Sequence, residues 1–205
     1  MRPCVRSVAL FGVVSLCGIA RGDEGEWRIG AGGGGAVANA RLGGASGTGV
    51  GYVARGRVCY GVPNTFELGL VGSYSHASDI AFDGAALDGQ TGNLFADLSE
   101  VSVGAEVRWT PGLGLARAFE RTSPYVAARA GAALLMRTSQ QLLTESGQLL
   151  LEPKDDLHLA PFVGAALGVE HRFGDHFFAA AELSASFAVD ERALTLTVEA
   201  AWAWY

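Results

Sequence analysis

The final stretch of the chain limits its possible folds more than any other segment. Residues 193–205 read ALTLTVEAAWAWY, with leucine, valine and tryptophan on one parity and Thr195, Thr197 and Glu199 on the other. A period of two places alternate side chains on opposite faces, so this stretch is predicted to be a β-strand with one apolar face. A strand needs a neighbour to satisfy its backbone hydrogen bonds. The rest of the chain is therefore expected to supply a sheet.

The same alternation recurs upstream, over residues 26–38, 50–62, 65–76, 97–109, 124–137, 157–173 and 176–189. With 29 glycines in 205 residues and 49% hydrophobic content, the chain is too apolar to be disordered and too glycine-rich to be helical. We therefore predict an all-β fold of eight antiparallel strands. Tight turns are expected at Pro63 and Gly174, and long loops over residues 77–96 and 138–156. Within the second loop, strand five is expected to continue, turn at residues 145–147 and come back.

The first 22 residues have the shape of a signal peptide. Arg2 and Arg6 precede an apolar run over residues 8–20, which Arg21 follows. This run is shorter than the roughly 18 residues that a transmembrane helix needs. We expect a cleaved signal over residues 1–22 and one domain over residues 23–205. No later run approaches that length, so a place in a membrane would require a barrel.

Charge and cysteine content exclude other classes. The formal net charge is −6, and removal of Arg2, Arg6 and Arg21 with the leader lowers it to −9. An acidic chain is a poor partner for nucleic acid, and none is expected. Cys59 is the single cysteine after the leader, so an intramolecular disulfide is ruled out and a small packed side chain is the expected role.

Aromatic residues indicate which face of the barrel points outward. When the strands are numbered up and down, most of the aromatic side chains gather at one end. A sparser set, Tyr52, Tyr74 and Phe187, lies at the other end. Bilayer interfaces select two such girdles, whereas a soluble lipocalin-like barrel, the alternative fold, has no reason for them. The predicted interface aromatics are Trp27, Tyr60, Phe66, Trp109, Phe173, Phe177, Trp202, Trp204 and Tyr205.

The opposite face then becomes the lumen, and it carries nearly balanced charge. Eight strands enclose a space that side chains just fill, so a plugged interior of Arg–Glu pairs is expected in place of an open channel. A narrow pore is the alternative if those pairs leave a gap. The predicted lumen network is Arg28, Arg55, Arg57, Glu67, Glu100, Glu106, Arg108, Arg129, Arg137, Glu170, Arg172, Glu182 and Glu199.

With its leader, alternating strands and terminal aromatic, the chain resembles the small eight-stranded outer-membrane β-barrels of Gram-negative bacteria, typified by the OmpA transmembrane domain and OmpX. The resemblance implies a transmembrane barrel with short periplasmic turns, longer extracellular loops and both termini on the periplasmic side. It also implies folding by the outer-membrane assembly machinery, which recognises a last strand ending in an aromatic, here Tyr205 or Trp204. Outer-membrane lipid and lipopolysaccharide are the expected partners, and any binding role falls to the outer loops.

Candidate chemistry is sparse. His76 and Ser78 share a parity at the end of strand three, and this pair is similar to the His-x-Ser pair of outer-membrane lipid A deacylases. A solvated polar strand end is the favoured interpretation, and a lipid hydrolase is the alternative. Gly30, Gly32 and Gly35 match a nucleotide-binding glycine pattern, but no helix follows them. His158, His171 and His176 cannot converge with His76 on one ion, so neither a metal nor a cofactor is expected.

Overall fold

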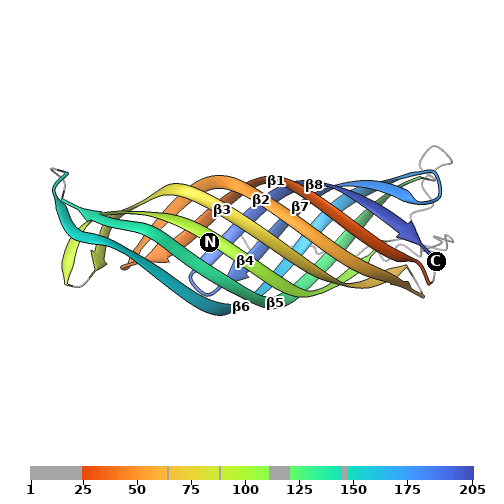
Figure 1. Ribbon diagram of the computed structural model, residues 1–205, viewed down its shortest axis with the longest axis horizontal. Coiled ribbons are helices and arrows are strands. Elements are labelled where there is room, and N and C mark those ends of the chain that lie inside the picture. The colour runs from red at the N-terminus through yellow and green to blue at the C-terminus, as the bar shows by residue number, and fades with distance from the viewer. Residues whose placement is uncertain (1–24, 64, 88, 111–120, 145–146) are drawn as a thin grey trace, which may run out of the picture.

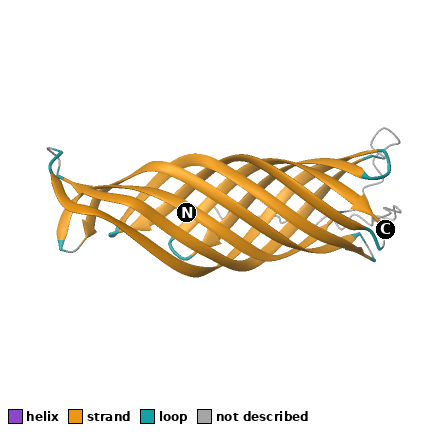
Figure 2. Cartoon of the chain, in the orientation of Figure 1, coloured by secondary structure: helices purple, strands orange, loops and turns teal. Residues whose placement is uncertain are grey.

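The computed structural model describes residues 25–63, 65–87, 89–110, 121–144 and 147–205, so the expected signal peptide lies outside the described residues. Each strand pairs antiparallel with the next, and β1 pairs with β8, which closes the barrel (Figures 1 and 2). The predicted eight-stranded antiparallel fold is confirmed. No helix in the described part of the chain is long and apolar enough to cross a bilayer. The strands are β1 (Trp27–Leu42), β2 (Ala45–Val62), β3 (Phe66–Leu87), β4 (Gln90–Trp109), β5 (Thr122–Leu143), β6 (Leu149–Phe173), β7 (Phe177–Ala188) and β8 (Glu191–Trp204).

The barrel is apolar on its outer wall and polar within. On β2, Arg55 and Arg57 are buried, whereas Val50, nearer the start of the strand, is 73% exposed. On β8, Thr197 and Glu199 are buried and Leu196 is 61% exposed. A soluble barrel would reverse these two faces, because its core has to be apolar. The outer wall is therefore built to meet lipid.

A belt of aromatic side chains surrounds the end where β1 begins and β8 ends, here called the terminal end. Trp27 pairs in register with both Tyr60 and Trp204, and its ring centroid lies 5.0 Å from that of Tyr60. Phe66 stacks on Trp109 with centroids 6.4 Å apart. The belt continues through Phe173, Phe177 and Trp202, which pair across neighbouring strands. Strand β5 contributes Tyr125, but its ring is buried inside the barrel.

The opposite end, here called the far end, differs from the prediction over residues 77–96, which form strands in place of a long loop, whereas the predicted continuation of strand five is confirmed. Strand β3 runs on to Leu87 and β4 begins at Gln90, and β5 and β6 are 22 and 25 residues long. A membrane crossing needs only about 9–11 residues per strand. The segments over residues 77–96 and 138–156 are thus mostly β-hairpins that project past the turn between β7 and β8 (Figure 1). Strand β5 ends at Leu143 and β6 begins at Leu149, and two of the three residues of the expected turn, 145 and 146, lie outside the described residues.

Two β-bulges explain why the first hairpin reads as a loop in the sequence. The register between β3 and β4 shifts between Ala77 and Ile80 and again between Phe82 and Ala85. Asp79 and Gly84 lie within these shifts with φ of 54° and 72°. Each extra residue moves the buried side chains to the other parity. Strand β3 therefore keeps one face buried, although its sequence no longer alternates with a period of two.

Candidate functional site

The candidate site is the barrel interior, where arginines and glutamates from most of the strands form ion pairs. At the terminal end, a guanidinium nitrogen of Arg28 lies 2.7 Å from a Glu67 carboxylate oxygen and 3.0 Å from one of Glu170. Arg108 also pairs with Glu170, at 2.8 Å. Glu26, just before β1, contacts Arg28 at 3.4 Å and was not predicted. Its position two residues before Arg28 is the sequence signal that could have identified it.

The network continues toward the middle of the barrel. Arg57 joins Glu170 to Glu199, which lies 3.1 Å from its Nε atom. Arg55 pairs with Glu182. Arg129 donates to Glu106 at 2.5 Å and to Glu182 at 2.7 Å, which links β5 to β4 and β7. Because these carboxylates and guanidiniums are almost fully buried, each depends on its partners for the interactions that water would otherwise supply. Most of these pairs thus join strands that are not neighbours in the sheet.

Glycines on β1 provide the room that these long side chains need. Gly32 is in register with Arg55 on one side and Glu199 on the other. A Cβ atom on Gly32 would lie 2.5 Å from Cγ of Glu199, and one on Gly30 would lie 3.5 Å from Nε of Arg57. The glycine-rich sequence of β1 therefore accommodates the ion pairs. A nucleotide-binding site would need a helix after these glycines, and a strand, β2, follows them.

Two further interior side chains are held by the network. The Tyr125 hydroxyl donates to Glu182 at 3.0 Å, and the Arg108 guanidinium lies 3.4 Å from the centroid of the Tyr125 ring. The Cys59 sulfur is buried and lies 3.9 Å from a Glu106 oxygen. Cys59 thus takes the packed position expected of it, among charged side chains.

Three members of the predicted lumen set lie apart from this network. Arg137 pairs with Glu191 at 3.3 Å and with Asp156 at 3.6 Å, nearer the far end. Arg172 donates to the carbonyls of Gly174 and Asp175 in the turn at the terminal end. Glu100 forms no ion pair with any residue that the structure describes. Parity alone predicts the face of a side chain, but it does not give its depth or its partners.

Hydroxyl groups fill the middle of the interior. Ser73 and Ser102 lie 2.6 Å apart, as do the hydroxyls of Ser184 and Thr195. Beside them is a cavity of about 40 Å³, which Arg55 and Arg129 also line. A space of this size holds one or a few water molecules.

The far end of the interior contains an apolar cluster, which we call the apolar cap. Ile80 and Phe82 from the first bulged hairpin are fully buried there, together with Leu94 of β4 and Leu142 of β5. They pack over the far ends of β1 and β2, since a Cβ on Gly47 or Gly49 would touch Ile80. Sequence reading missed the cap because the bulges hide its periodicity. Its buried members are Ala40, Ala77, Ile80, Phe82, Ala85, Leu94, Ala96, Leu98 and Leu142.

The structure pairs His76 with a serine other than the one the sequence suggested. Nδ1 of His76 lies 2.9 Å from the Ser99 hydroxyl on β4, and the imidazole ring packs against Tyr52. Ser78 is exposed, next to the first bulge. A serine–histidine contact is the first requirement of a nucleophile, but the histidine also needs an orienting group. No carboxylate in the described residues contacts His76.

The other histidines are engaged separately. His171 lies 2.7 Å from the Thr122 hydroxyl, His176 lies 3.1 Å from the Ala203 carbonyl, and His158 lies 3.6 Å from Asp156. No group of three or more His, Cys, Asp or Glu residues able to hold a metal ion occurs in the part of the chain that the structure describes.

Together, the closed eight-stranded sheet, the lipid-type outer wall and the ion-paired interior define a transmembrane β-barrel. Among solved structures, the chain is similar to Neisserial surface protein A, with a TM-score of 0.56 and 16% identity over 87% of this chain and 99% of that one. It is also aligned with the attachment invasion locus protein Ail of Yersinia pestis, with a TM-score of 0.44 and 18% identity over 88% and 99% of the two chains. The β-barrel domain of Pseudomonas aeruginosa OprF gives 0.43 and 17% over 88% and 98%.

These likenesses concern the fold, which is that of the small outer-membrane barrels. No protein-family model matches the chain. No curated protein matches it either. The role of this barrel therefore has to be argued from its own residues.

Proposed function

We propose that the protein is exported to the outer membrane of a Gram-negative cell and has a structural or surface-binding role there, without enzymatic activity. The terminal end, with its dense aromatic belt, is the periplasmic side. The far end is the cell surface. Lipid surrounds the outer wall, and the outer-membrane assembly machinery inserts the folded strands.

The observation that carries this proposal is the projecting sheet of β3 to β6. Its hairpins extend past the length needed to cross a bilayer, and the apolar cap stiffens them from inside. Strand β6 gains its β7 partner only at Phe162, so residues 157–160 pair with β5 alone. Leu157 and Leu159 on this stretch are 62% and 72% exposed. A stiff sheet with an accessible edge suits contact with another macromolecule.

Labelling on intact cells tests both the location and the orientation. In a Cys59→Ser background, Gln90→Cys places a thiol at the far end and Asp175→Cys places one at the terminal end; both native side chains are exposed. A maleimide that cannot cross membranes should label Gln90→Cys on intact Gram-negative cells and Asp175→Cys only after lysis. The reverse pattern, or recovery of the protein with the inner membrane, would reject the proposal.

A further inference from the structure

Two arginines on the outer wall differ from those inside because no residue in the described part of the chain pairs with them. Arg41 on β1 and Arg192 on β8 are exposed, and neither guanidinium forms an ion pair or hydrogen bond with any residue described by the structure. Asp190 lies beside them, and the hydrogen bond that it shares with Arg41 is a backbone one: the Arg41 amide donates to the Asp190 carbonyl oxygen at 2.9 Å. The two positive charges are therefore available to a ligand.

The register places both arginines on one patch. Arg192 is directly opposite Asn39, and Arg41 follows Asn39 by two residues on the same face of β1. Diagonal neighbours of this kind in an antiparallel pair are about 7–8 Å apart. Two guanidinium groups at that spacing can close on one phosphate, to which each presents a planar pair of donors. Asn39 donates to Thr48 at 2.9 Å, so the patch is polar across β8, β1 and β2.

The patch lies where the outer wall changes from apolar to polar. Val37 and Leu194 lie two residues farther toward the membrane on β1 and β8, and they are 42% and 49% exposed. Val50, which pairs with Val37, is 73% exposed. Phe187 of the far-end girdle pairs directly with Arg192. At this depth a lipid carries its phosphate group, with its acyl chains directed toward Val37 and Leu194.

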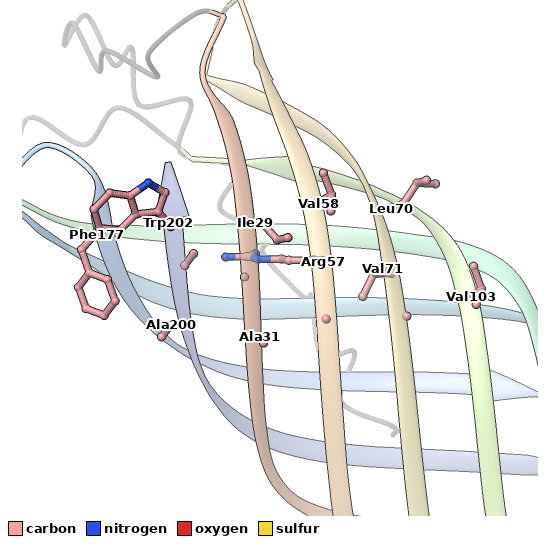
Figure 3. Close-up of a pocket in the computed structure, with 14 residues that line it drawn as sticks. Ile29, Ala31, Arg57, Val58, Leu70, Val71, Val103, Phe177, Ala200 and Trp202 are labelled. Carbon is pink, nitrogen blue, oxygen red and sulfur yellow. The ribbon is translucent and has the colours of Figure 1, made fainter. Parts of the chain in front are cut away.

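The outer wall below the patch has space for an acyl chain. Past Val37, the outward positions of β1 are Gly35, Gly33 and Ala31, and a Cβ on Gly35 would meet no atom within 4 Å. Ala31 is in register with Ala200 and Gly56, and these small residues line an apolar groove of about 720 Å³ that crosses the strands from Phe177 of β7 to Val103 of β4 (Figure 3). The outward face of β1 is thus a shallow track leading down from the arginines.

We propose that Arg41 and Arg192 clamp a phosphate of a lipid A-type glycolipid, with one acyl chain lying along the β1 track. This inference rests on the proposed function, because such lipids face the far end only if that end is the cell surface. The phosphate supplies charge complementarity to the arginine pair, and the acyl chain covers apolar surface that side chains of β1 leave open.

Binding to the purified, folded barrel tests the clamp without depending on its orientation in cells. Lipid A would be titrated into the barrel in phosphatidylcholine vesicles and followed by native mass spectrometry. The double variant Arg41→Gln/Arg192→Gln should lose about tenfold in affinity, the equivalent of one or two charge-assisted contacts. Arg121→Gln, which changes an exposed arginine at the terminal end, is the matched control and should bind as the parent does.

Ligand variants separate the sources of the phosphate. Lipid A without its phosphates should bind the parent as weakly as lipid A binds the double variant, and inorganic phosphate should not displace lipid A. Gly35→Leu, which fills the track, should weaken binding while both arginines remain. Equal binding of lipid A by the parent and the double variant, with both folded, would overturn the clamp, as would displacement by inorganic phosphate alone. The labelling result for the proposed function would stand in either case.

Discussion

Arg129 on β5 donates a hydrogen bond to Glu182 on β7 across the barrel interior, at 2.7 Å. The two strands are separated by β6 in the sheet, so the contact passes over the inner face of β6 and is not part of the backbone ladder. Both side chains are buried, and Glu182 also accepts from Arg55 and Tyr125. The stability of the barrel therefore depends on these buried ion pairs as well as on the backbone hydrogen bonds of the sheet.

Removal of one partner should therefore destabilise the barrel strongly. Glu182→Gln removes the carboxylate that Arg129 and Arg55 share, and breaking a buried ion pair by removing one partner costs about 3–5 kcal/mol. Denaturant unfolding of the reconstituted barrel measures this loss. Glu100→Gln is the matched control because Glu100 has no ion pair among the described residues, and it should change the free energy of unfolding by less than about 1 kcal/mol. Equal effects of the two substitutions would contradict the network.

Glycine positions on β1 should differ sharply by face. A Cβ on the interior Gly32 would lie 2.3 Å from the Val198 carbonyl oxygen, so Gly32→Leu should destabilise the barrel by about 1–3 kcal/mol or prevent its folding. Gly35→Leu on the outer face of the same strand meets open space and should cost less than about 1 kcal/mol. Gel mobility before and after heating reports the folded fraction. Normal folding of Gly32→Leu would show that the interior has space for the larger side chain and would contradict this prediction.

Truncation in the apolar cap should loosen the far end without unfolding the barrel. Phe82→Ala removes a fully buried ring at a cost of about 3–5 kcal/mol. Hydrogen exchange should then rise in the projecting parts of β3 and β4 while the ion-paired region keeps its protection. Phe95→Ala, which removes a ring that is 37% exposed on the same hairpin, serves as the comparison and should change exchange little. Uniform loss of protection along all strands would mean that cap and network unfold together.

The His76–Ser99 contact gives the hydrolase alternative a specific test. The purified barrel is expected to release no acyl chain from lipid A, because no carboxylate among the described residues orients His76. Fatty acid release is measured directly by mass spectrometry. Release that disappears in Ser99→Ala and persists in Ser78→Ala would reverse this expectation and identify Ser99 as the nucleophile.

Strand existence and face could be predicted because period-two alternation is a local property of the sequence. Arg55, Glu106 and Glu182 all lie on the interior face that their parity predicts. Partners could not be predicted in the same way, because Arg129 meets Glu182 only after the barrel closes and sets the register of every strand. The bulge at Asp79 could not be predicted for a different reason. A single extra residue reverses the parity, so Ile80 and Phe82 lie in the interior although the upstream alternation places them on the outer face.

The apolar cap has a consequence for ions. An ion that enters between the projecting hairpins of β3 to β6 meets the buried side chains of Ile80, Phe82 and Leu94. A constriction lined by such side chains sheds its water, and a bare ion then faces a large desolvation barrier. Although its interior is rich in charge, the barrel should be electrically silent in planar-bilayer recordings. Its arginines and glutamates are paired with one another, so they are not expected to line a conducting path.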